Sequence, residues 1–223
     1  MKTELIDKRR AEMFHALRVS GLLLLGFLFI TQQVLTRGWI YELDHYILNL
    51  KNPKFTGLAG HILIALDDLG LRWFTATVLL ICASFIGWRF KSFRPVNLSL
   101  LALLSLNVAV GATKIFIGRT KPRLSVDVLF ANGMSYPSGH ASNAVLSWGI
   151  LAYLIYRYAK VDRYQGRLAS AGVVLISLTV CVVSLIRHTH WFSDLLGGLF
   201  VGSALLVAVI AIDRYVPSKS QLH

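Results

Sequence analysis

Three short stretches of this chain hold residue types that suit the chemistry of a bound anion. The first is a lysine followed by a cluster of basic residues (114–123), the second is Pro-Ser-Gly-His (137–140), and the third is rich in histidine and ends in an aspartate (187–194). Cationic side chains and the free N–H groups at a helix start both bind phosphate. The three stretches therefore predict a phosphate-binding pocket, provided that the fold brings them together.

Two histidines and one aspartate in these stretches could carry out a reaction on that phosphate. His190 and Asp194 are four residues apart, so the carboxylate can hold one imidazole nitrogen protonated and leave the other free to attack. His140 could protonate a departing alkoxide, because imidazole titrates near neutral pH. We predict phosphoryl transfer to His190, followed by hydrolysis of the phosphohistidine by water.

The composition places these stretches in a membrane protein. Of the 223 residues, 55% are hydrophobic and only 15% are charged, and the mean hydropathy is +0.60, which is too apolar for a soluble domain. The formal net charge of +12 does not require nucleic acid as a partner, because the basic residues lie in short loops between apolar segments. Cys82 and Cys181 lie inside apolar runs and are interpreted as packing residues.

Six apolar segments are long enough to cross a bilayer. Their approximate bounds are 19–35, 71–90, 96–117, 138–158, 168–186 and 194–212. The residues between the first two segments mix acidic and basic side chains with apolar ones, which predicts one or two short amphipathic helices at the membrane surface. We expect one all-α domain over residues 1–223, with six transmembrane helices in a bundle.

The distribution of lysine and arginine predicts an orientation for this bundle. Most of the 23 basic residues fall in the tails and in the loops on the side of both termini, so the positive-inside rule makes this side cytoplasmic. The three stretches then lie at the ends of spans on the extracytoplasmic face of the cell membrane. Basic residues that nevertheless occur on this face, near the histidines, are Lys114, Arg119, Lys121, Arg123 and Arg187.

The three stretches resemble the three signatures of the type 2 phosphatidic acid phosphatase superfamily. Residues 137–140 match its Pro-Ser-Gly-His signature in full. The signature of a lysine, six residues and Arg-Pro is matched by Lys114 and Pro122, with Lys121 in the arginine position. The resemblance by motif covers residues 114–194, and the six-span layout extends it to most of the chain.

The remaining signature of that superfamily is matched in part. It consists of Ser-Arg, five residues, a histidine, three residues and an aspartate, and the last two are matched by His190 and Asp194. The Ser-Arg positions are occupied by Val183 and Ser184. Arg187 follows one helical turn later and is expected to reach the same phosphate; Arg119 or Arg123 could fill the gap instead.

The resemblance implies roles for individual residues. His190 would be the nucleophile, Asp194 its partner and His140 the general acid. The residues implied for phosphate binding are Lys114, Lys121, Ser138 and Gly139. Lysine at position 121 keeps the charge but lacks the planar fork of arginine.

The resemblance also implies a substrate class and a place in the cell. The family uses no metal ion, so no cofactor is expected, and the substrate would be a lipid phosphate whose tail stays in the bilayer: a polyprenyl diphosphate, phosphatidylglycerol phosphate or phosphatidic acid. The short loops are more typical of a bacterial member in the cell membrane than of a glycosylated eukaryotic one.

Three other interpretations of the same residues remain. A zinc site of His140, His188, His190 and Asp194 is disfavoured, because the surrounding lysines and arginines would repel a divalent ion. A lipid phosphotransferase would share the phosphohistidine step and differ only in the acceptor. A degenerate relative that binds or transports anionic lipid would use the same basic pocket, and the altered third signature is its support.

Overall fold

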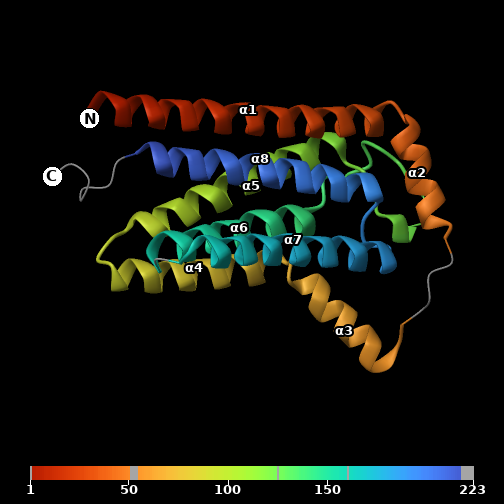
Figure 1. The fold of residues 1–223 in the computed structure, drawn as a ribbon. Helices are drawn as coiled ribbons and strands as arrows, with labels where there is room; N and C mark the ends of the chain where they lie inside the picture. The colour runs from red at the N-terminus through yellow and green to blue at the C-terminus, as the bar shows by residue number, and fades with distance from the viewer. Residues whose placement is uncertain (1, 51–54, 125, 160, 217–223) are drawn as a thin grey trace.

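The computed structural model describes residues 2–50, 55–124, 126–159 and 161–216, and every regular element in these ranges is helical. Six long helices form the bundle in Figure 1: α1 (Lys2–Leu35), α4 (Arg72–Arg89), α5 (Arg94–Ile117), α6 (Gly139–Tyr158), α7 (Arg163–Ile186) and α8 (Phe192–Tyr215). The shorter helices are α2 (Trp39–Leu48), α3 (Gly57–Asp68) and the 3-10 turn η1 (Pro122–Leu124). The predicted all-α membrane fold, with short helices after the first span, is confirmed.

The long helices differ in whether their length and hydropathy are sufficient to span a membrane. Four of the described helices, α1, α5, α7 and α8, are each long and apolar enough to span a bilayer. The pair α3 and α4 reaches that standard only together, and it is bent by 55°. The total of six spans therefore stays a prediction, although each predicted segment coincides with one of the six long helices.

Helix α6 is less apolar because it lies at the centre of the bundle. It packs against α4, α5, α7 and α8, so few of its residues face lipid and small polar side chains such as Ser142 are buried. A Cβ added at Gly202 of α8 would come within 2.9 Å of the Ser142 carbonyl oxygen. Small residues thus let α6 and α8 approach closely, as is common between transmembrane helices.

The first helix starts earlier than the apolar segment predicts. Helix α1 begins at Lys2, although the apolar segment begins near residue 19, because no glycine or proline interrupts the basic residues before it. Its 34 residues correspond to a length of about 50 Å, compared with about 30 Å for the hydrocarbon core of a bilayer. The start of α1 and the end of α8 lie at the same end of the bundle (Figure 1).

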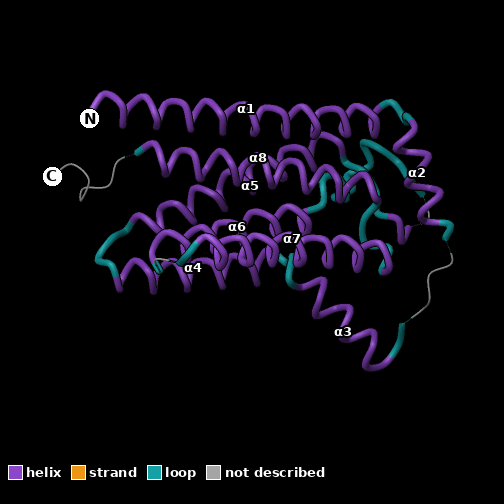
Figure 2. The backbone as a smooth tube through the Cα atoms, viewed as in Figure 1, coloured by secondary structure: helices purple, strands orange, loops and turns teal. Residues whose placement is uncertain are grey.

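The loops that carry the three stretches gather at the opposite end of the bundle. Figure 2 shows the connections α5–α6 and α7–α8 together at this end, beside α2. They rest on a small apolar cluster in which Tyr136 and Ile117 pack against Val34 and Ile40. Gly118 ends α5 in the left-handed conformation, with φ of 56°, which glycine adopts without strain. The chain therefore turns back over the bundle end at this point.

Candidate active site

The two histidines singled out by the sequence face each other at this end of the bundle. The ring centroids of His140 and His190 are 5.9 Å apart, and their planes make an angle of 59°. The backbone N–H of Ser138 donates to the carbonyl oxygen of Asp194 at 2.8 Å, which ties the start of α6 to the start of α8. The second and third stretches therefore form one site.

Lys114 brings the first stretch to the same place. It lies in the last turn of α5, is 7% exposed, and donates from Nζ to the carbonyl oxygens of Met134 and Ser135, the latter at 3.3 Å. Its Cε is 4.0 Å from the position that a Cβ on Gly139 would take. The ammonium group is thus held beside the Ser-Gly-His turn, where the sequence predicts a phosphate.

Asp194 is placed to orient His190. The Nδ1 atom of His190 is 3.4 Å from Oδ2 of Asp194, and both side chains are almost fully buried. The same Oδ2 accepts hydrogen bonds from the Trp191 backbone N–H at 3.0 Å and from the Ser135 hydroxyl. Because the carboxylate is fixed on Nδ1, the Nε2 atom of His190 is the one left for chemistry.

Arg119 lies behind Asp194, at the centre of a buried ion cluster, rather than with a free guanidinium toward the two histidines. Its side chain is 0% exposed. It donates to Asp194 Oδ1 at 3.1 Å, to Ser193 Oγ at 2.7 Å, to Asp44 Oδ2 at 2.8 Å and, through Nε, to Asp127 Oδ1 at 2.9 Å. This placement fits a residue that holds Asp194, and it differs from the phosphate contact expected from the sequence.

Removing that guanidinium should destabilise the protein. In the Arg119→Gln variant, buried carboxylates lose their shared positive partner, so the free energy of unfolding should fall by about 3–5 kcal/mol. Thermal and denaturant unfolding of the detergent-solubilised protein would measure this. Arg123→Gln is the matched control, because Arg123 is exposed; equal losses in both variants would contradict a special role for Arg119.

A second buried carboxylate occupies the neighbourhood of the missing family arginine. Ser184 donates from Oγ to Asp67 Oδ1 at 2.8 Å, and Arg187 donates from Nη1 to Asp67 Oδ2. The Asp67 side chain is 4% exposed, whereas that of Arg187 is 29% exposed. The carboxylate at the end of α3 thus positions the arginine at the end of α7.

The remaining predicted site residues lie around the histidine pair. Ser138 is the N-cap of α6, and its Oγ accepts a hydrogen bond from the Ala141 backbone N–H at 3.3 Å. Lys121 is partly buried just before η1, and its charge acts on His190. Within the described ranges, no three His, Cys, Asp or Glu side chains are grouped so that they could hold a metal ion.

The surroundings of His190 favour its neutral form. Burial lowers the pKa of this histidine, and the positive charges of Lys114 and Lys121 act in the same direction, while Asp194 opposes them. A neutral imidazole has a free electron pair on one ring nitrogen. His190 is therefore held in the form that a nucleophile requires.

Comparisons with known proteins agree with this architecture. In sequence, 103 residues align at 23% identity with phosphatidylglycerophosphatase B of Bacillus subtilis (strain 168), which is 46% of this chain and half the length of that relative. In structure, the chain matches the crystal structure of a transmembrane PAP2-type phosphatidylglycerolphosphate phosphatase from Bacillus subtilis with a TM-score of 0.74, over 90% of this chain and 98% of the other, at 18% identity. This second likeness shows a shared fold.

The family itself is shown by a match along most of the bundle. The sequence model of the PAP2 superfamily matches residues 69–217, which begin just before α4 and reach the end of α8. Lys114, His140, His190 and Asp194 all fall within that range. With this match and the observed helical bundle, the chain belongs to the PAP2 superfamily.

Proposed function

We propose that this protein is a membrane-embedded lipid phosphatase that works through a phosphohistidine at His190. The observation that carries the proposal is the arrangement of three side chains: the His140 ring lies 5.9 Å from the His190 ring, and Asp194 contacts His190 on Nδ1. A nucleophile, its orienting carboxylate and a proton donor are thus assembled at one end of a membrane bundle.

The reaction would take two steps at this site. Nε2 of His190 attacks the phosphorus of the lipid phosphate, the bond from phosphorus to the lipid oxygen breaks, and His140 gives that oxygen a proton. His140 then takes a proton from water, whose oxygen attacks the phosphohistidine and breaks the phosphorus–nitrogen bond. Inorganic phosphate leaves, and both histidines return to their starting forms.

Cationic groups and the start of α6 would hold the phosphate during both steps. The groups in question are the side chains of Lys114, Lys121 and Arg187 and the backbone around Ser138 and Gly139. Their positive charge would offset the charge of the transferring group without a metal ion. Arg119 takes a different part in this proposal: it positions Asp194.

The substrate we favour is phosphatidylglycerol phosphate. The sequence relative and the solved structure are both named as phosphatidylglycerol phosphate phosphatases. The site lies at a bundle end, where a lipid headgroup can reach it while its tail remains in the bilayer. The distribution of lysine and arginine places this end on the extracytoplasmic side. Polyprenyl diphosphate and phosphatidic acid offer the same terminal phosphate and are the alternatives.

Phosphate release by the purified protein in detergent tests the function. The three lipids are assayed separately, in excess EDTA, and we expect release from phosphatidylglycerol phosphate to be fastest. Release that is lost in EDTA and restored by zinc would contradict the metal-free mechanism. No release from any lipid by folded protein would contradict a phosphatase. Addition of an alcohol acceptor separates hydrolysis from phosphotransfer, because a transferase makes the new phosphate ester as its main product, whereas a phosphatase mainly releases inorganic phosphate.

Replacing Arg187 should weaken binding of the substrate phosphate. In Arg187→Ala, a charge-assisted contact is lost, so kcat/KM should fall about 10-fold to 100-fold. Initial rates over a range of lipid concentrations measure this. Arg89→Ala removes an exposed arginine in the last turn of α4 and serves as the control. If both variants keep the native kcat/KM, Arg187 does not replace the family arginine.

The acid side of the pH profile should reflect the depressed pKa of His190. Because burial lowers that pKa, the imidazole stays neutral below pH 6.5, the ordinary value for histidine. We therefore expect kcat/KM to remain high as the pH falls through 6.5 and to decline only at lower pH, when His190 gains a proton. A decline centred above pH 6.5 would contradict this assignment.

A further inference from the structure

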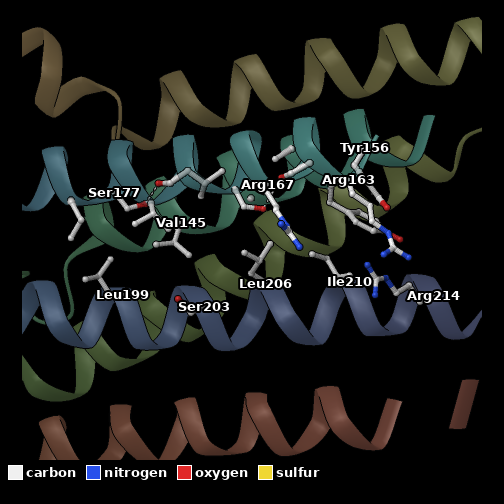
Figure 3. Close-up of a pocket in the computed structure, with 18 residues that line it drawn as sticks. Val145, Tyr156, Arg163, Arg167, Ser177, Leu199, Ser203, Leu206, Ile210 and Arg214 are labelled. Carbon is white, nitrogen blue, oxygen red and sulfur yellow. Dashed lines mark hydrogen bonds between the residues drawn. The ribbon is translucent and has the colours of Figure 1, made fainter. Parts of the chain in front are cut away.

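A groove of about 820 Å³ runs along the bundle, between α7 and α8 and over α6. Figure 3 shows its lining side chains in the gap between these helices. The groove extends from Ser177 and Leu199 near the middle of the helices to Arg163 and Arg214 at the end where α7 begins and α8 ends. None of the residues assigned to the phosphatase site lines it.

Three arginines mark one end of this groove. Arg163 and Arg167 lie in the first two turns of α7, and Arg214 lies in the last turn of α8. In Figure 3 their nitrogen-bearing ends lie in the gap between the two helices. All three side chains belong to exposed residues, so this end of the groove presents a concentrated positive charge to its surroundings.

These arginines differ from two others at the same end of the bundle. Arg94 donates to Asp213 Oδ1 at 2.5 Å, and Arg157 pairs with Oδ2 of the same carboxylate. Within the described ranges, Arg163, Arg167 and Arg214 form no such ion pair, and the Arg214 guanidinium lies over the Tyr153 ring, with Cζ 5.8 Å from its centroid. The positive charges of Arg163, Arg167 and Arg214 are therefore available to an external anion.

The rest of the groove suits a hydrocarbon chain. Its walls are mostly apolar, and small residues such as Gly149, Gly166 and Ser203 leave the hollow between the larger side chains. Its volume falls in the range of about 300–1,000 Å³ that is usual for ligand sites. An apolar channel that ends in cations at the membrane interface complements a molecule with an acyl tail and an anionic head.

We propose that this groove binds one anionic phospholipid, with an acyl chain between α7 and α8 and the phosphodiester against Arg163, Arg167 and Arg214. The N-terminus of α7 is already capped by the Asp162 carboxylate, which accepts a hydrogen bond from the Gln165 backbone N–H at 2.8 Å, so the recognition of the phosphodiester rests on the three arginines. A zwitterionic lipid carries an ammonium group beside its phosphate, and this positive charge offsets the attraction of the phosphate to the same arginines. The proposal is independent of the phosphatase activity, because the two sites lie at opposite ends of the bundle.

Native mass spectrometry of the detergent-solubilised protein tests the proposal. Phosphatidylglycerol and phosphatidylcholine are added separately at equal concentration, and the fraction of protein that retains one lipid is measured. We expect preferential retention of phosphatidylglycerol. The Arg163→Gln/Arg167→Gln double variant should weaken its binding about tenfold or more and leave phosphatidylcholine unchanged. Arg89→Gln/Lys91→Gln, which removes two exposed charges outside the groove, should retain phosphatidylglycerol like the native chain.

A second pair of variants tests the apolar part without altering charge. Ser203→Phe places a large ring in the groove and should reduce retention of phosphatidylglycerol, whereas Val182→Phe adds the same ring on an exposed part of α7 outside the groove and should not. Thermal unfolding confirms that each variant is folded. Equal retention of both lipids by the native protein, or undiminished retention by the arginine double variant, would overturn the proposal and indicate a nonspecific lipid belt.

Discussion

His190→Ala should lower kcat by about 10⁶-fold, the loss found when a covalent nucleophile is removed from an enzyme whose binding groups remain. The side chain is 4% exposed and packs between Asp194 and the His140 ring. Removing it leaves the phosphate-binding cations in place but no atom to form the covalent bond. The same variant should therefore still bind the lipid phosphate.

The decisive measurement for His190 is labelling together with turnover. Native protein incubated with lipid carrying ³²P in its terminal phosphate and quenched rapidly in alkali should retain label, and His190→Ala should retain none. His188→Ala, two residues away, is the matched control and should keep both label and turnover. Folded His190→Ala that releases phosphate at more than about 1% of the native rate would place the nucleophile elsewhere.

Asp194→Asn should lower kcat by about 10⁴-fold, as the loss of an orienting carboxylate does in comparable histidine sites. The carboxylate fixes Nδ1 of His190 as the protonated nitrogen, whereas an amide can stabilise the other tautomer and so block the attacking nitrogen. Steady-state phosphate release measures the effect.

The Asp44→Asn variant tests whether Asp194 acts by orienting His190 or only by stabilising the ion cluster around Arg119. Asp44 contacts the Arg119 guanidinium at 2.8 Å and the Ser193 backbone N–H at 2.8 Å, and no hydrogen bond joins it to His190 within the described structure. Both variants should lower the unfolding midpoint, but only Asp194→Asn should lower kcat by several orders of magnitude. Similar losses of kcat would mean that Asp194 acts through the cluster alone.

The sequence predicts the bundle and the meeting of the histidines for clear physical reasons. Long apolar segments must become helices in a bilayer, because no water is present to satisfy the backbone. The short connection between the last two spans then forces His190 to the end of the bundle where His140 begins α6. The meeting of His140 and His190 could therefore be predicted from the sequence, and their catalytic roles are proposals.

The carboxylates that contact Arg119 could not be predicted from the sequence. Asp44 is 75 residues from Arg119 in the chain and lies in a segment whose mixed polarity indicates a surface helix. A count of charges identifies a cation near the histidines, but it does not show whether that cation faces a substrate or a carboxylate. Only the packing of α2 against the end of α8 decides between these possibilities.

The altered third signature shows a similar limit. A motif assumes that each role stays at a fixed position along the chain, whereas Ser184 accommodates Asp67, which is 117 residues away. Asp67 in turn contacts Arg187. By the spacing of the motif, serine at position 184 is the loss of an arginine. The tertiary structure shows that Asp67 and Arg187 bring a carboxylate and a guanidinium to the same region.

The two buried carboxylates Asp44 and Asp67 both precede residue 69, where the match to the family model begins. A shortened protein that starts there would retain every signature residue and yet lose Asp44, one of the three carboxylates around Arg119, and Asp67, the carboxylate that pairs with Arg187. We therefore expect the minimal catalytic unit of this chain to be larger than the segment by which its family is recognised. Chimaeras that exchange the first three helices between relatives would need to exchange these arginines and aspartates as matched sets.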